Sequence, residues 1–125
     1  GGLTPIFLLG EVEREASGIA QALRTDRPRW EHLDLPAVAA VLKGAHFYVG
    51  NDSGITHLSA VLGVPTWALF GPTDPAHWAP RGPAVRILRA AGRGAPEMAD
   101  LPVSEVWAAL RRGALDGLAA EARKP

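Results

Sequence analysis

One stretch of the sequence combines residue types that can bind a phosphorylated sugar: Asn-Asp-Ser-Gly-Ile-Thr-His at residues 51–57. It follows an apolar run and leads into an amphipathic one, as expected for a strand that turns into a helix. The free amides at the start of a helix bind phosphate well, and a glycine there lets a ligand approach the backbone closely. We therefore predict a nucleotide-sugar phosphate site at this turn.

We expect different roles for the individual groups of this turn. Asp52 should not touch phosphate, because like charges repel, and is expected to accept hydrogen bonds from sugar hydroxyls. His57 lies four residues after Ser53, so one face of the first helical turn can present both. The amides of Ser53 and Gly54 are expected to point at the anion, with Ile55 as a further donor. A helix terminus favours an anion by only about 0.3–1 kcal/mol at exposed sites, so further contacts must add to binding.

An alternative interpretation needs no ligand. Asp-Ser-Gly before a helix is an ordinary capping sequence, with Asp52 or Ser53 as the N-cap. A histidine in the first turn, such as His57, can likewise be structural. Residues 52–54 alone do not separate the two interpretations.

A second turn favours the ligand interpretation. Gly71-Pro72-Thr73-Asp74-Pro75 leaves another apolar run, residues 64–70, with a hydroxyl and an acid. If the two strands are neighbours in one sheet, both loops converge on one crevice. The alternative is that Asp74 only caps a short turn with Pro75 at its first position.

Composition excludes several classes of function. There is no cysteine, which excludes disulfides, zinc ribbons and thiol catalysis. The 13 basic and 13 acidic residues balance, so nucleic acid is not an expected partner. We predict no metal site, because the histidines show no pairing with acids at metal-ligand spacing. They are His32, His46, His57 and His77.

The periodicity of apolar residues predicts the elements that position these turns. Strands are expected at 6–9, 47–49, 64–70 and 85–88, and helices at 11–23, 35–43, 53–62 and 102–110. Asp34 and Ser104 are candidate N-caps, residues 29–34 hold one short strand or none, and 75–83 and 89–102 are expected loops. After Gly113 the chain is a further short helix or frayed. This order predicts an α/β fold, a Rossmann-like three-layer α/β/α arrangement with a mostly parallel sheet.

The length of 125 residues suits one domain. No apolar run approaches the roughly 20 residues needed to span a bilayer. Because Gly1-Gly2 leads almost at once into a strand, we expect the chain to be a piece of a larger protein. Trp67, Trp78 and Trp107 are then candidates for an apolar face that a partner domain covers.

Three segments resemble glycosyltransferase family 9, the ADP-heptose:lipopolysaccharide heptosyltransferases, which have the two-domain GT-B fold. They are Asp-Ser-Gly-Ile-Thr-His-Leu-Ser-Ala at 52–60, Gly-Val-Pro-Thr at 63–66 and Leu-Phe-Gly-Pro-Thr-Asp-Pro at 69–75. The resemblance covers nearly the whole chain and corresponds to the C-terminal half of the family. It implies that residues 1–125 form the domain that binds the nucleotide-sugar donor.

The resemblance also implies roles for individual residues. Ser53 and Gly54 would meet the diphosphate through backbone amides, Asp52 would hold sugar hydroxyls, and His57 would lie near the phosphates or the sugar. The remaining candidates are Thr73 and Asp74 at the border of the donor pocket, Leu33 against adenine, and Glu11 or Glu13 at the ribose hydroxyls.

By the same resemblance, the N-terminal acceptor domain, which holds the presumed catalytic base, is absent from this chain. The parent would transfer a heptose-type sugar, with inversion, from an ADP-sugar to a lipid-linked, lipopolysaccharide-core-like saccharide at the membrane surface. It would be cytoplasmic, with peripheral attachment to the inner membrane as an option, and would need no cofactor. The chain alone would hold no catalytic residue and would not turn over.

Two other functions are compatible with parts of the pattern. A stand-alone flavodoxin-like regulatory or nucleotide-binding module could use Asp52 as a phospho-acceptor, but no lysine lies between Lys43 and Lys124 to support that chemistry. A GT-B-related enzyme that uses a UDP-sugar, such as a sugar epimerase, would share the fold.

Overall fold

The computed structural model describes residues 3–9, 29–31, 33–92, 94 and 96–115. The chain forms two compact units, Gly1–Val38 and Ala39–Pro125, and each is considered by itself. The helix predicted at 11–23, together with Glu11 and Glu13, lies outside the described residues.

The first unit contains a pair of parallel strands. β1 (Phe7–Leu9) pairs with β2 (Arg29–Glu31), with Phe7 opposite Arg29. Residues 29–34, for which the sequence predicted one short strand or none, therefore contain a short strand. The predicted cap before the next helix, α3 (Leu35–Lys43), is confirmed, because Oδ1 of Asp34 accepts a hydrogen bond from the amide of Ala37 at 2.9 Å.

The second unit is built on a three-stranded parallel sheet. Its strands are β3 (Tyr48–Asn51), β4 (Thr66–Phe70) and β5 (Val85–Arg89), in the order β3-β4-β5. The predicted neighbours are therefore paired, and the α/β fold with parallel strands is confirmed. β3 runs two residues further than predicted, because Gly50 and Asn51 continue the ladder opposite Ala68 and Leu69.

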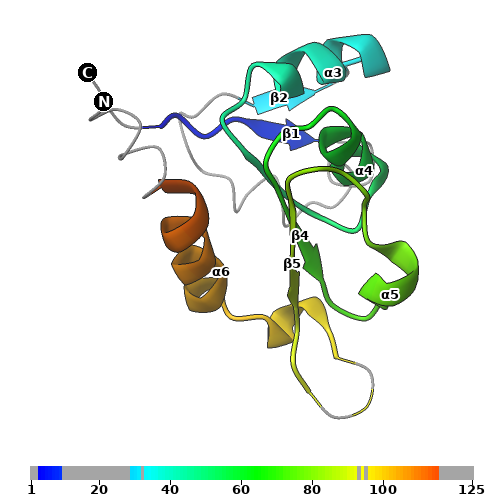
Figure 1. The fold of residues 1–125 in the computed structure, drawn as a ribbon, viewed down its shortest axis with the longest axis vertical. Helices are drawn as coiled ribbons and strands as arrows, with labels where there is room; N and C mark the ends of the chain where they lie inside the picture. The colour runs from blue at the N-terminus through cyan, green and yellow to red at the C-terminus, as the bar shows by residue number, and fades with distance from the viewer. Residues whose placement is uncertain (1–2, 10–28, 32, 93, 95, 116–125) are drawn as a thin grey trace. The chain divides into compact units, whose positions relative to one another are not determined.

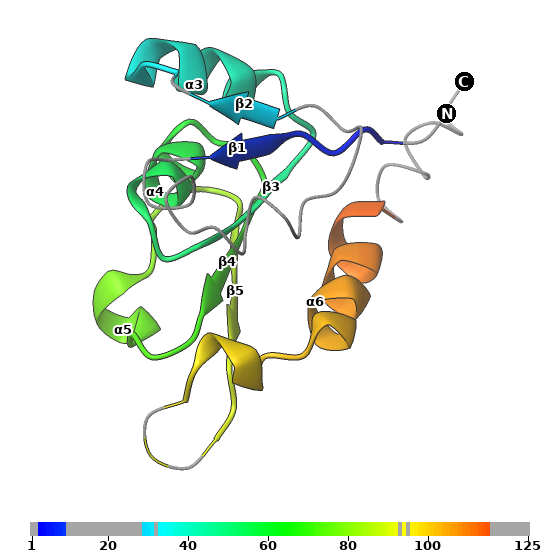
Figure 2. The same ribbon diagram turned by 180° about the vertical axis from the view of Figure 1, so that it is seen from behind.

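Helices lie on both faces of this sheet (Figures 1 and 2). α4 (Gly54–Val61) connects β3 to β4, and α6 (Val103–Leu110) follows the 3-10 turn η1 (Met98–Asp100). A buried hydrogen bond of 2.8 Å between the hydroxyls of Ser59 and Thr66 ties α4 to one face of β4. Trp67 points to the opposite face, since successive side chains of a strand alternate, and that is the side on which α6 lies.

Three details differ from the sequence-based expectations. The N-cap of α6 is Pro102 rather than Ser104, because Pro102 holds extended backbone (φ −66°, ψ 142°) directly before the helix and leaves Ser104 inside the first turn. The predicted loop 75–83 opens with a short helix, α5 (Pro75–Trp78). Trp67 is only 3% exposed and is a core residue, whereas Trp78 and Trp107 are exposed as predicted.

The chain ends, within the described residues, in a π-helical turn, η2 (Arg111–Leu115). The tail after Gly113, predicted as a further short helix or frayed, lies almost entirely outside the described residues, which end at Leu115. In the described part of the chain, no helix combines the length and apolar character that crossing a membrane requires.

Candidate functional site

The turn between β3 and α4 lies at the carboxyl edge of the second unit's sheet. β3 ends at Asn51 and α4 begins at Gly54, so only Asp52 and Ser53 connect them. The carboxyl edge of a parallel α/β sheet is the edge at which ligands bind. The predicted strand-turn-helix junction is therefore present.

The hydroxyl of Ser53 caps the helix. Ser53 has extended backbone (φ −154°, ψ 164°), and its Oγ accepts a hydrogen bond from the amide of Thr56 at 3.4 Å. The capping interpretation thus holds for the Ser53 side chain.

A residue that the sequence did not single out, Thr56, fixes this turn. It is completely buried, and its Oγ1 donates to the carbonyl oxygen of Asn51 at 2.5 Å. With that proton committed, Oγ1 can only accept from the hydroxyls of Tyr48, at 3.1 Å, and Ser53, at 3.2 Å. The proton of the Ser53 hydroxyl is therefore used within the protein, and the Ser53 side chain offers a ligand no free donor. The Ser-x-x-Thr spacing from the N-cap was the available clue.

Two amides at the start of α4 remain free. The amide of Thr56 donates to the Ser53 hydroxyl, and the amide of His57 donates to the Ser53 carbonyl oxygen. Among the described residues, the amides of Gly54 and Ile55 have no hydrogen-bond acceptor. Free first-turn amides next to the positive end of the helix dipole attract an anion.

Nothing in the fold requires a glycine at position 54. Gly54 is exposed, and a Cβ there would meet no atom within 4 Å beyond its chain neighbours and its own helix. Its φ is not positive; among the described glycines only Gly63 and Gly94 have positive φ. By contrast, a Cβ on Gly71 would lie 2.5 Å from the amide nitrogen of Met98. The open space at Gly54 is available to a ligand.

Asp52 and His57 form a pair beside these amides. Nε2 of His57 lies 3.8 Å from Oδ1 of Asp52, and their side chains are 44% and 24% exposed. The sequence analysis did not foresee this pair, in which the helical turn brings the imidazole back over the preceding carboxylate. Both groups retain exposed surface that can contact a ligand.

The second predicted loop leaves the adjacent strand at the same edge. Asp74 is the N-cap of α5, with Oδ1 accepting from the amide of Ala76 at 2.9 Å and Pro75 in the first turn. Its carboxylate also lies 3.5 Å from Nδ1 of His77 and 3.7 Å from Arg89. The hydrogen bond from Ala76 chiefly, and the nearby charge of Arg89, lower the pKa of Asp74 below its usual value. The capping alternative is realised, and His77 is a second histidine paired with an acid.

Strand pairing brings the two loops together. Because β3 and β4 are parallel neighbours, Asp52 and the half-buried Thr73 both follow the carboxyl ends of adjacent strands. Arg89, which ends β5 opposite Phe70, adds a positive charge at this edge that the sequence analysis did not assign. A basic residue directly after an apolar strand was the clue.

The other candidates are not among the described residues of the second unit. Leu33 is 38% exposed and belongs to the first unit. Glu11 and Glu13 lie outside the described residues. Their roles stay predictions.

Comparison with known proteins identifies related sequences. A sequence model for glycosyltransferase family 9 (heptosyltransferase) matches residues 12–106. The chain is 44% identical over 64 residues to the lipopolysaccharide heptosyltransferase 1 of Pseudomonas aeruginosa, covering 51% of this chain and 18% of that protein. It is 29% identical over 91 residues to the lipopolysaccharide heptosyltransferase 2 of Escherichia coli K12, covering 67% and 26%. The chain thus spans a minor part of these relatives.

Solved structures share the fold. An Escherichia coli heptosyltransferase solved with ADP aligns with a TM-score of 0.73 and 29% identity, over 90% of this chain and 35% of that one. A family 9 glycosyl transferase from Veillonella parvula aligns with a TM-score of 0.77 over 92% of this chain and 37% of its own, at 20% identity, which shows likeness of fold alone.

Proposed function

The chain belongs to glycosyltransferase family 9, the heptosyltransferases, and we propose that it binds the ADP-sugar donor at the carboxyl edge of β3 and β4. The observation that carries this proposal is Gly54, a glycine that the fold does not need, next to free helix amides and open space. A related heptosyltransferase was solved with ADP, which supports the choice of nucleotide.

In this proposal the diphosphate lies over the first turn of α4. The amides of Gly54 and Ile55 donate to its oxygens, and the helix dipole adds about 0.3–1 kcal/mol, or up to about 2 kcal/mol in a partly buried geometry. The amide of Ser53 donates to the diphosphate as well, while the Ser53 hydroxyl holds the turn, since it is committed to Thr56.

The sugar lies next to the diphosphate, within reach of the second loop. Asp52 accepts hydrogen bonds from sugar hydroxyls, and His57, 3.8 Å from it, contacts the phosphates or the sugar. Thr73 and Asp74 border the pocket. Leu33 packs against adenine, and Glu11 or Glu13 accepts from the ribose hydroxyls, as the family resemblance implies.

The reaction needs more than these residues. We propose that the parent has the GT-B architecture and transfers a heptose-type sugar to a lipopolysaccharide-core-like acceptor at the cytoplasmic membrane surface. A base from the other domain deprotonates the acceptor hydroxyl, which attacks the anomeric carbon as ADP leaves. The amides at Gly54 and Ile55 stabilise the negative charge that develops on the leaving diphosphate. Relatives named as lipopolysaccharide heptosyltransferases support this choice.

Calorimetric titration of ADP into the 125-residue chain tests the donor site. We expect saturable binding by the wild type and by Gly44→Ala, a control whose added Cβ would make only ordinary contacts of 3.6 Å or more. Gly54→Val should weaken binding by about tenfold or more, since it fills the space of the diphosphate and blocks at least one hydrogen bond to a charged group.

Two results would contradict the proposal. One is a wild type that does not bind ADP at millimolar concentration. The other is an affinity that Gly54→Val leaves unchanged. UDP is titrated in the same way. Tighter binding of UDP than of ADP would favour a UDP-sugar enzyme of related fold.

A further inference from the structure

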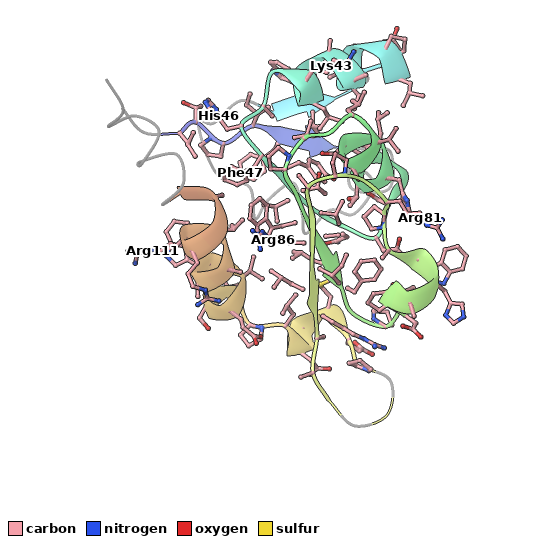
Figure 3. All side chains as sticks on the ribbon, in the orientation of Figure 1. Lys43, His46, Phe47, Arg81, Arg86 and Arg111 are labelled. Atoms are coloured by element: carbon pink, nitrogen blue, oxygen red, sulfur yellow. The ribbon has the colours of Figure 1, made fainter. Side chains whose placement is uncertain are left out.

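A cavity lies apart from the turn at Asp52–Gly54, since none of the turn residues lines it. Its volume is about 270 Å³, and it is lined by sheet residues Trp67, Arg86 and Leu88 and by helical residues Ala109, Arg112 and Gly113. Trp67 points to the face of the sheet opposite α4, and Figure 3 shows Arg86 on the same side, toward α6. The cavity thus lies between β4, β5 and the end of α6.

The indole of Trp67 is the most confined group of this cavity. It is 3% exposed, packs edge-to-face with Phe47 at 5.7 Å, and has the guanidinium of Arg86 5.8 Å from its ring centre. Its Nε1 is buried, and none of the residues that the structure describes accepts a hydrogen bond from it. Buried donors of this kind are normally satisfied, so an orphaned one indicates a missing acceptor.

Gly113 shows where the indole N–H edge lies. A Cβ at Gly113 would be 2.8 Å from Cζ2 of Trp67, 3.7 Å from Cε2, to which Nε1 is bonded, and 3.4 Å from Nε of Arg86. The N–H edge and the guanidinium are therefore close to the same short piece of backbone, which lines the cavity. This backbone belongs to the π-helical turn η2, a conformation that is frequent at functional sites.

The polar side chains around the cavity are all donors. Arg86 and Arg112 carry positive charge, the indole donates, and none of the three can accept. Within residues 33–92 and 96–115, no carboxylate lies within ion-pair distance of either arginine. The remaining wall is apolar, with Leu88 and Ala109.

From this arrangement we infer that the cavity binds a small carboxylate with a short apolar body. The carboxylate accepts hydrogen bonds from the two guanidinium groups and from Nε1 of Trp67, and the hydrocarbon packs on Leu88 and Ala109. Guanidinium groups bind carboxylates in a planar, two-bonded geometry. The cavity is slightly below the usual size of small-molecule sites, which matches a ligand of a few carbon atoms.

Two-dimensional ¹H–¹⁵N NMR of the full chain tests this inference through the indole N–H signal of Trp67, assigned by its loss in Trp67→Phe. Sodium butyrate is the probe, and sodium chloride at equal ionic strength is its control. We expect butyrate to move the Trp67 signal downfield in a saturable way at millimolar concentration. The signals of the exposed Trp78 and Trp107 should stay in place.

Charge variants identify the ligand's partners. Arg112→Gln should weaken butyrate binding about tenfold, the effect of losing one charge-assisted hydrogen bond. Arg111→Gln is the matched control, because Arg111 neighbours it in sequence but lies on the outer side of η2, away from the cavity (Figure 3). Saturating ADP should leave butyrate binding unchanged.

Three results would overturn the inference. A Trp67 signal that does not respond means that water alone fills the cavity. An equal response to chloride means general charge screening. Phosphate that binds as tightly as butyrate means a plain inorganic-anion site without a role for the apolar wall.

Discussion

Oγ1 of Thr56 donates a hydrogen bond to the main-chain carbonyl oxygen of Asn51 at 2.5 Å. This contact joins the first turn of α4 to the last residue of β3, and Thr56 is completely buried. The hydroxyl of Thr56 therefore contacts the residue before the turn, Asn51, and the last residue of the turn, Ser53, and so fixes the turn formed by Asp52 and Ser53. The position of the proposed donor site depends on this link.

Replacing Thr56 by valine should destabilise the protein and weaken donor binding. The change keeps the shape but removes the hydrogen bonds to the part-buried carbonyl of Asn51 and hydroxyl of Tyr48, at a cost of about 0.5–1.5 kcal/mol each. Urea unfolding gives the stability, and calorimetry with ADP gives the affinity.

Thr66→Val is the matched control for that variant. Thr66 is also fully buried, and its Oγ1 bonds to Ser59 and to the carbonyl of Val64, but it does not touch the donor turn. It should lower stability by a similar amount while ADP affinity in the folded protein stays the same. If both variants weaken ADP binding equally, Thr56 has no special link to the site.

Replacing Asp52 by asparagine should weaken binding of the sugar without weakening binding of the nucleotide. Its pair with His57 is partly exposed and 3.8 Å long, so its loss should change stability by less than about 1 kcal/mol. Because Asp52 is proposed to contact sugar hydroxyls, affinity for an ADP-sugar should fall while affinity for ADP alone does not. Calorimetry with both ligands measures this; equal losses would place Asp52 at the nucleotide instead.

Asp74 should make stability depend on pH in the acid range. Its pKa is lowered in the folded state, mainly by the amide of Ala76, so its stabilising contribution is present above the ordinary value of 3.8 and is lost as the pH falls further. The difference in unfolding free energy between wild type and Asp74→Asn should therefore shrink below about pH 3.8.

Arg89→Gln is the control for this pH effect. It removes a charge 3.7 Å from Asp74 but leaves the Ala76 amide, the larger cause, in place. Most of the acid-dependent loss should persist in this variant. If the acid-dependent loss of stability disappears in Arg89→Gln, then the ion pair, rather than the cap, lowers the pKa of Asp74.

Glycines at two other positions should not tolerate a side chain. A Cβ on Gly71 would meet the backbone of η1 at 2.5 Å, and one on Gly113 would meet the ring of Trp67 at 2.8 Å. Alanine at either should cost about 1–3 kcal/mol through overpacking. Gly54→Ala, with open space around it, should match or exceed wild-type stability in the same urea experiment. A similar loss at all three positions would contradict the argument that Gly54 is kept free for a ligand.

Sequence alone determined the local features of this protein. The strand before the turn, the cap at Asp34 and the two polar loops were all readable. The motif at 52–60 also pointed to the correct family. Such features depend on residues within about one helical turn of each other, and the local pattern therefore contains their physical cause.

Tertiary structure decided which of two competing partners each polar group takes. The hydroxyl of Ser59 bonds to that of Thr66 only because α4 packs against β4, and the residues around Ser59 do not specify that partner. Trp67 is as apolar as Trp78, yet one is buried and the other exposed, because only the pairing of β4 with β5 and the packing of Gly113 cover the first. Burial and hydrogen-bond competition arise from contacts between distant segments, which the local order of residues does not specify.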